Sequence, residues 1–212
     1  KRGLRFVMLR PGFHAMYEFA EIEDVKIENL DLEYPDFILD REKALNRVDE
    51  STVLYISNPN NPTSNLLLTD EDRDFVVKLC DKANIVVIDE AYYEFSGVTF
   101  RELVANGECR NLVIVRTFSK AFALAGARIG YLIGYPELIK ELDRLRPLYD
   151  IPIPSLAAAL AALRDVDYMK EIVKKVVEMR NSLAERIKRE LGLRVLPSAT
   201  NFIFIELPVD AR

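Results

Sequence analysis

Cysteine is almost absent from this 212-residue chain, in which Cys80 and Cys109 are the only two. Two cysteines are too few for the disulfide framework of a small secreted protein, so we expect both thiols to be buried in a reducing compartment. Histidine is rarer still. The only one, His14, is more typical of a surface or packing position than of a catalyst, and we predict no role for it.

Charge of one sign is not gathered anywhere in the chain. The 29 basic and 34 acidic side chains give a net charge of -5 and are mixed along the sequence, which argues against a nucleic-acid partner. No apolar run approaches the ~20 residues that cross a bilayer, and no signal peptide opens the chain. The sequence therefore predicts a cytoplasmic protein without a nucleic-acid or membrane partner, and no metal site is expected.

Apolar side chains make up half of the sequence and fall into short runs. Five runs are typical of strands buried on both faces, at 5–9, 53–57, 84–89, 111–116 and 130–134. Helical patterns separate most of them, and the pattern at 69–83 begins with acidic residues, which the helix dipole favours at an N-terminus. Strands that alternate with helices indicate an α/β domain with a mostly parallel sheet between two helical layers, a three-layer αβα architecture.

The pattern changes after Pro154. Residues 155–164 are rich in alanine, and apolar side chains then recur at helical spacing from 165 to 191, where Gly192 closes the pattern. Two strand-like runs follow, at 193–196 and 201–207. They indicate the beginning of a second, smaller α/β unit after a helix long enough to bridge two domains.

Both ends of the chain look like cuts inside a longer protein. The first residues enter an apolar run without a starting methionine, and the strand-like run 201–207 stops at Arg212 without a partner after it. We therefore expect residues 1–163 to form a large domain whose N-terminal part is missing. Residues 164–212 are expected to form an interdomain helix and the truncated start of a small C-terminal domain.

Polar motifs follow three of the strand-like runs. They are Asn-Pro-Asn-Asn-Pro-Thr at 58–63, Asp-Glu-Ala-Tyr at 89–92 and Thr-Phe-Ser-Lys at 117–120. Taken singly, they have ordinary alternatives: a turn, a helix cap and a solvated lysine. Ligands of open α/β sheets bind beyond the carboxyl ends of the strands. Three polar strand ends together therefore indicate one site that joins amide, carboxylate, phenol, hydroxyl and amine groups.

In this order and spacing, and with Ala-Phe-Ala-Leu-Ala-Gly-Ala-Arg-Ile-Gly-Tyr after the lysine, the motifs resemble the fold-type-I pyridoxal-phosphate aminotransferases. Within that group the chain is most similar to the histidinol-phosphate aminotransferases, and the resemblance covers about residues 11–207. It implies the large-domain fold of these enzymes and pyridoxal 5'-phosphate as cofactor. It also implies a small-molecule amino donor with a 2-oxo acid as substrates, and a homodimer.

The resemblance implies roles for four residues of these motifs. Lys120 would form the Schiff base with the cofactor and move the proton at the substrate α-carbon. Asp89 would face the pyridine nitrogen and keep it protonated, so that the ring can accept electrons. Asn61 and Tyr92 would hydrogen-bond to the ring oxygen, and the bond between Asn61 and Pro62 is expected to be cis.

The resemblance also implies contacts at the cofactor phosphate and ring face. Arg128 would bind the phosphate in forked geometry. Thr117 and Ser119 would donate hydroxyl hydrogen bonds to it, with a helix start as the alternative. Phe13 is placed like the ring that stacks on the cofactor, with a core position as the alternative. The family usually has glycine where this chain has Ser64, so a tight turn that needs the freedom of glycine is not expected to form unchanged.

Three functions stay open at this point. The leading one is amino transfer from histidinol phosphate to 2-oxoglutarate, which gives imidazole-acetol phosphate and glutamate in histidine biosynthesis by a ping-pong route. A related aromatic aminotransferase or a threonine-phosphate decarboxylase would share the equivalents of Lys120, Asp89 and Arg128. The third is a non-catalytic, truncated α/β module, against which the intact motif positions argue.

Overall fold

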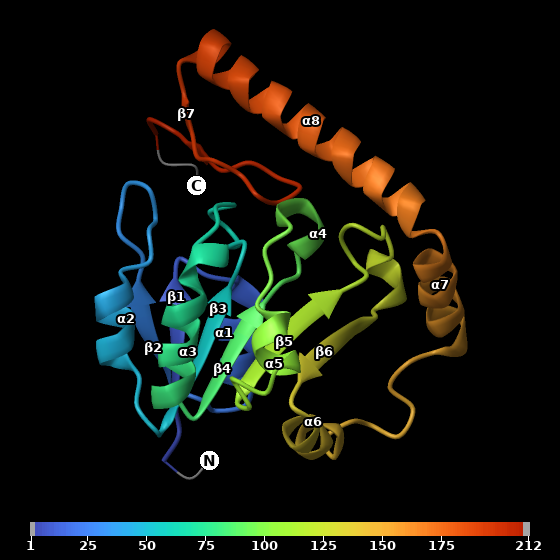
Figure 1. The fold of residues 1–212 in the computed structure, drawn as a ribbon. Coiled ribbons are helices and arrows are strands. Elements are labelled where there is room, and N and C mark those ends of the chain that lie inside the picture. Colours follow the sequence, from blue (N-terminus) through green and yellow to red (C-terminus); the bar gives the residue numbers. More distant parts are fainter. Residues whose placement is uncertain (1–2, 210–212) are drawn as a thin grey trace.

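A mixed sheet of six strands forms the body of the protein in the computed structural model, which describes residues 3–209 (Figure 1). The strands are β1 (Arg5–Arg10), β2 (Ile27–Asp31), β3 (Thr52–Ser57), β4 (Ile85–Asp89), β5 (Leu112–Thr117) and β6 (Gly130–Gly134). Their spatial order is β2-β1-β3-β4-β5-β6. The first five are parallel and β6, at one edge, is antiparallel. The predicted mostly parallel α/β sheet is confirmed.

Helices flank this sheet and continue beyond it. They are α1 (His14–Ile22), α2 (Arg41–Arg47), α3 (Arg73–Lys82), α4 (Tyr93–Ser96), α5 (Arg101–Ala105), α6 (Pro136–Asp143), α7 (Ile153–Arg164) and α8 (Val166–Leu191). The predicted helix at 69–83 corresponds to a 3₁₀ turn, η1 (Asp70–Asp72), followed by α3. Thr69 and Asp72 start it as a capping box, in which the carboxylate accepts the Thr69 N–H at 2.8 Å. A second 3₁₀ turn, η2 (Ala125–Ala127), precedes β6.

One face of the sheet carries most of the core. Helices α2, α3 and α5 cover this face (Figure 1), and side chains of the central strands such as Leu54, Ile88 and Leu112 are fully buried against Val76 and Leu79 of α3. Burial of one such side chain contributes about 1.5–3 kcal/mol. Both cysteines are free and buried, as expected.

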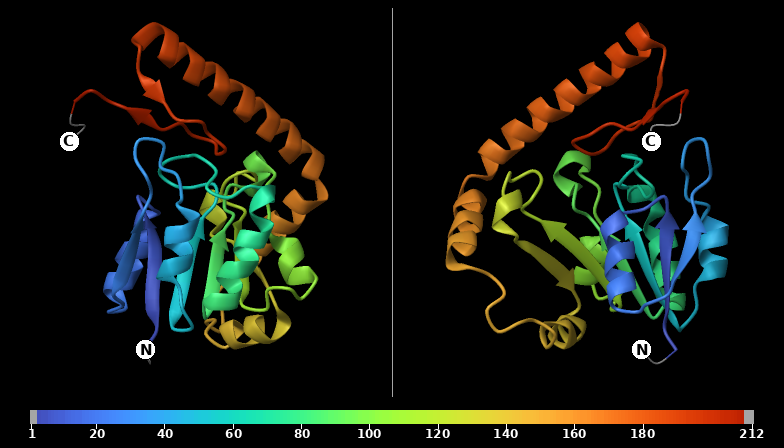
Figure 2. Two further views of the ribbon diagram at one scale, coloured as in Figure 1. Left: turned by 60° about the vertical axis from the view of Figure 1, so that its left-hand side comes forward. Right: turned by 180° about the vertical axis from the view of Figure 1, so that it is seen from behind.

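The opposite face is more thinly covered. Helix α1 lies there (Figure 2) and has no buried residue. Along β4, Val86 and Ile88 point into the core and are buried, whereas Val87 and Asp89 on the second face are half-buried. Edge strand β6 is buried on neither face. The expectation that the runs at 84–89 and 130–134 are buried on both faces is therefore wrong, because few helical side chains cover the second face and no strand pairs with the outer edge of β6 in the described chain.

Helix α8 follows α7 and leads to a two-stranded antiparallel unit, β7 (Arg194–Val195) and β8 (Ile205–Glu206). The predicted helix is confirmed as α8, whose N-terminus is capped by Asp165 and whose C-terminus ends at Gly192 with φ of 65°. The strands are shorter than the runs at 193–196 and 201–207, because hydroxyls between them bond locally. Those of Ser198 and Thr200 donate to the Phe202 carbonyl at 2.6 and 3.0 Å and shape a loop instead of a ladder.

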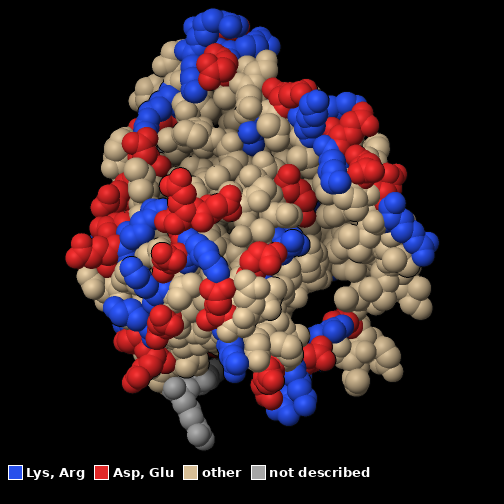
Figure 3. All heavy atoms as spheres, viewed as in Figure 1, with Lys and Arg blue, Asp and Glu red and all other residues tan. Residues whose placement is uncertain are grey.

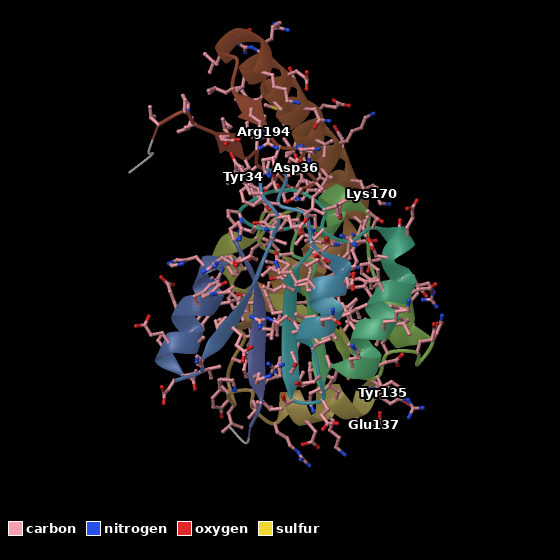
Figure 4. All side chains as sticks on the ribbon, turned by 90° about the vertical axis from the view of Figure 1, so that its left-hand side faces the viewer. Tyr34, Asp36, Tyr135, Glu137, Lys170 and Arg194 are labelled. Atoms are coloured by element: carbon pink, nitrogen blue, oxygen red, sulfur yellow. The ribbon has the colours of Figure 1, made fainter. Side chains whose placement is uncertain are left out.

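This two-stranded unit and α8 lie over the edge at which the parallel strands end (Figures 1 and 2). A loop after β2 reaches up to it. The Arg194 guanidinium contacts Asp36 at 2.6 Å and Glu206 at 3.0 Å, and the Tyr34 hydroxyl donates to Glu206 at 2.5 Å. Figure 4 shows Tyr34, Asp36 and Arg194 together, at the opposite end of the sheet from Tyr135.

Ser64 makes a second connection to the same unit. Its backbone takes the left-handed conformation, with φ of 65°, although serine lacks the freedom of glycine. The Ser64 N–H donates to the Asn60 carbonyl at 2.9 Å, and its own carbonyl accepts the Ala199 N–H at 2.8 Å. The buried turn at Ser64 therefore joins the loop after β3 to the segment between β7 and β8.

Surface features agree with the composition. Basic and acidic side chains are interspersed over the face drawn in Figure 3. Within residues 3–209, no helix is both long enough and apolar enough to cross a membrane. The boundary after residue 163 stays a prediction, and residues 1–2 and 210–212 of the two predicted domains lie outside the described residues.

Candidate active site at the carboxyl edge of the sheet

The strand order reverses next to β1, which has β2 on one side and β3 on the other. Such a switch point leaves a crevice at the carboxyl ends of the strands, where open α/β sheets bind ligands. The loops after β1 and β3 lie on the two sides of this switch point. They are joined by the side-chain amide of Asn60, which donates to the Pro11 carbonyl at 3.1 Å.

The Asn-Pro-Asn-Asn-Pro-Thr motif forms a loop that the side-chain amide of Asn58 holds in place. Asn58 is fully buried, and its side-chain oxygen accepts the N–H groups of Leu67 and Leu68, both at 2.9 Å. These bonds fix the loop as a rigid unit, so that it can present the next asparagine in one orientation. The bond between Asn61 and Pro62 is cis, as expected.

Asp89 ends β4 at this edge, between the ends of β3 and β5. One carboxylate oxygen accepts the Ala91 N–H at 2.9 Å, and the other accepts the hydroxyl of Tyr55. Burial raises the pKa of Asp89, while the Tyr55 hydroxyl, the Ala91 N–H and the positive charge of Lys120 oppose that rise. The carboxylate is thus partly desolvated, yet held by two donors and faced by an ammonium group.

Lys120, Tyr92 and Asn61 meet next to this carboxylate. The Lys120 amine lies 5.4 Å from the centroid of the Tyr92 ring, and the Asn61 amide donates to the Tyr92 hydroxyl at 3.3 Å. Tyr92 is buried and its ring packs edge-on against Phe202, with 5.4 Å between centroids. The three polar strand ends therefore come together as expected, and Lys120 stays exposed to solvent.

The hydroxyls of Thr117 and Ser119 lie on the turn that leads from β5 to Lys120. Thr117 Oγ1 accepts the Ser119 N–H at 3.0 Å and donates to the Ile129 carbonyl at 3.4 Å. No helix of the described chain begins at either residue, so the helix-start alternative is wrong. The Thr117 hydroxyl shapes this turn, and the hydroxyl of Ser119 makes no hydrogen bond within the part of the chain that the structure describes.

Arg128 and Phe13 lie further from this centre. Arg128 is exposed, has φ of 52°, and donates to the Ala125 carbonyl at 3.0 Å. Phe13 directly precedes α1 and is 37% exposed, so the alternative of a core position is wrong. Across residues 3–209, no hydrogen bond or ring contact ties either side chain to Lys120 or Asp89.

The sequence reasoning missed a buried ion pair behind the site. Arg116 contacts one Glu90 carboxylate oxygen at 3.0 and 2.8 Å, and its guanidinium lies 3.5 Å above the Tyr93 ring. The other Glu90 oxygen accepts the Phe100 N–H at 3.0 Å. Because side chains alternate along a strand, Glu90 points away from the second face of the sheet, on which Asp89 lies. The pair therefore joins the ends of β4 and β5 from the core side.

Tyr55 was not predicted from the sequence either. It lies on β3, on the same face as Asp89, and its phenol is the donor to that carboxylate. The sequence does carry signals for these residues. Glu90 and Arg116 are charges directly beside motif residues, and Tyr55 precedes the strand end by two positions, which places it on the same face as Ser57.

Comparison with known proteins shows to which family the chain is related. The profile described as "Aminotransferase class I and II" matches residues 1–210. Histidinol-phosphate aminotransferase of Sulfurisphaera tokodaii is 37% identical over 207 residues, which are 96% of this chain and 57% of that protein. The same enzyme of Thermococcus gammatolerans is 36% identical over 202 residues, 95% of this chain and 56% of its own length. The chain thus spans less than two thirds of these relatives.

Solved structures agree on the fold. Histidinol-phosphate aminotransferase from Sinorhizobium meliloti, crystallised with pyridoxal-5'-phosphate, has a TM-score of 0.86 and 31% identity, and the match covers 99% of this chain and 57% of that one. L-Threonine-O-3-phosphate decarboxylase from Porphyromonas gingivalis has a TM-score of 0.74 over 94% of this chain and 58% of its own, with 22% identity. The second likeness shows the fold alone.

Proposed function

The chain belongs to the class I and II aminotransferases, and from that premise we propose that its site binds pyridoxal 5'-phosphate and serves amino transfer from histidinol phosphate to 2-oxoglutarate. One observation carries the proposal. The positive charge of Lys120 acts on the Asp89 carboxylate from the neighbouring strand end, and the Lys120 amine lies 5.4 Å from the ring centroid of Tyr92, which pairs with Asn61. The substrate choice is supported by the 37% and 36% identical relatives, which are histidinol-phosphate aminotransferases.

The donor set fits this cofactor. When bound, the cofactor supplies an aldehyde that links to an amine and a ring that withdraws electrons from the substrate α-carbon. Asp89, which accepts from two donors, would hold a proton at the pyridine nitrogen. Lys120 would carry the cofactor and move the proton at the α-carbon. Asn61 and Tyr92 would orient the ring through its oxygen.

The remaining residues would bind the phosphate and the ring face. The Ser119 hydroxyl has no hydrogen-bond partner among residues 3–209, and Thr117 orders the turn that presents it. The exposed guanidinium of Arg128 would add a forked, charge-assisted contact. The exposed ring of Phe13 would cover one face of the cofactor. The homodimer and the cytoplasmic location stay predictions from the sequence.

A comparison of substrates tests the proposal. Purified protein loaded with cofactor is expected to transfer the amino group from histidinol phosphate to 2-oxoglutarate with a higher kcat/KM than it shows for phenylalanine or tyrosine, and without releasing carbon dioxide from threonine phosphate. Product glutamate is measured for the amino donors and carbon dioxide for threonine phosphate. A preference for the aromatic amino acids, or decarboxylation of threonine phosphate, would replace the proposed substrate by the corresponding alternative.

A further inference from the structure

Tyr55 is buried on the second face of the sheet, the face on which Asp89 lies, with 8% of its surface exposed. It pairs with Val87 in the parallel register, so that Asp89 is two residues further along the neighbouring strand. A tyrosine side chain spans this diagonal, and its hydroxyl donates to one carboxylate oxygen of Asp89. Among the described residues, the Tyr55 hydroxyl makes its hydrogen bond to Asp89. A phenylalanine at this position would therefore fill the same space and lack only this hydrogen bond.

The two donors to Asp89 act on different oxygens. Ala91 N–H holds one oxygen at 2.9 Å and Tyr55 holds the other, which fixes the plane of the carboxylate. A hydrogen bond to the charged form of a carboxyl favours that form. The bond from Tyr55 therefore lowers the pKa of Asp89 and opposes the rise that burial causes. Burial and the Asp89 charge raise the pKa of Tyr55, so its hydroxyl keeps its proton and stays a donor.

We propose that Tyr55 is a positioning residue for amino transfer, which orients the Asp89 carboxylate and keeps it ionised toward the cofactor ring nitrogen. The proposal rests on the proposed function. The other polar or charged groups that bear on this pair are Lys120 and Tyr92, from the turn after β5 and the end of β4. Neither replaces Tyr55 in the described chain, where the hydrogen bonds to the Asp89 carboxylate come from Tyr55 and Ala91.

The test removes one oxygen atom. In Tyr55→Phe the Asp89 pKa is expected to rise, because the charged form loses a donor, and the cofactor dissociation constant is expected to increase about tenfold or more. Tyr17→Phe is the matched control. Tyr17 is half-buried and its hydroxyl is bonded too, to the Leu9 carbonyl at 3.2 Å and to Asn29 at 2.9 Å, but it does not touch Asp89.

Two measurements separate positioning from general stability. Carboxyl ¹³C NMR of the cofactor-free protein reports the Asp89 pKa, which should rise in Tyr55→Phe and stay unchanged in Tyr17→Phe. Cofactor titrations in the Asp89→Asn background should show the Tyr55→Phe effect largely abolished, since the two residues act through one contact. An unchanged Asp89 pKa in Tyr55→Phe overturns the proposal. If the unaltered protein binds no cofactor, the proposed function fails, whereas the NMR titration still decides the role of Tyr55.

Discussion

Asp89→Ala is expected to lower amino-transfer turnover on the order of a hundredfold or more, the scale seen when one preorganised electrostatic group is removed from an active site. Asp89 would hold the proton on the pyridine nitrogen, and without that proton the ring withdraws electrons poorly. Cofactor binding should be weakened but retained, because Ser119 and Arg128 would still contact the phosphate. Steady-state kinetics with saturating cofactor measure the effect.

A smaller loss is expected from Tyr92→Phe, which serves as the comparison. Tyr92 would only orient the ring oxygen, and its hydroxyl is shared with Asn61. Near-native turnover in Asp89→Ala, or a loss in Tyr92→Phe as large as that in Asp89→Ala, would contradict the assignment of the electron-withdrawing role to this carboxylate.

Arg116→Met is expected to destabilise the fold by about 3–5 kcal/mol, because it leaves the Glu90 carboxylate buried without its charge partner. Glu90 is 1% exposed and Arg116 6%. For a domain of this size the thermal midpoint should fall by roughly 10 °C. Arg73→Met is the matched control. Its partner, Glu108, is exposed, and exposed ion pairs contribute about 0–1 kcal/mol.

The loss in free energy of unfolding that Arg116→Met causes should grow as the pH rises. Burial already raises the pKa of Glu90, and Arg116 opposes that rise. Without Arg116 the folded-state pKa rises further above the value of an unfolded glutamate, about 4.3. Protonation then favours the folded state, so the deficit should be smallest near that value and grow as the pH rises. A pH-independent deficit, measured by urea unfolding, would mean that lost packing dominates.

The sequence predicted which polar residues meet at the carboxyl edge of the sheet, because these residues follow strand ends. Asn61, Asp89 and Lys120 each follow an apolar run, and the carboxyl ends of parallel strands share one edge, so their proximity needed no knowledge of strand order. β2 escaped prediction because Ile27–Asp31 mixes apolar and polar side chains at the sheet edge. Helix α1 escaped because it buries no residue and lacks a side-chain cap.

Residues that support the site were harder to find, since their roles depend on register. A tyrosine inside the apolar run at 53–57 looks like a core residue until Tyr55 is placed diagonal to Asp89. Glu90 and Arg116 become partners only once β4 and β5 are known to be neighbours, with Asp89 opposite Val115. Sequence spacing alone does not give these relations, because each residue pair comes from two different strands.

The most direct test of the account is to locate the lysine that carries the cofactor. Protein loaded with pyridoxal 5'-phosphate is reduced with borohydride, digested, and mapped by mass spectrometry. The reduced adduct is expected on the peptide that contains Lys120. It should be lost in Lys120→Ala and persist in Lys140→Ala, which changes a lysine of α6. An adduct on another lysine of the unaltered protein, or one that survives in Lys120→Ala at the same yield, would contradict the account.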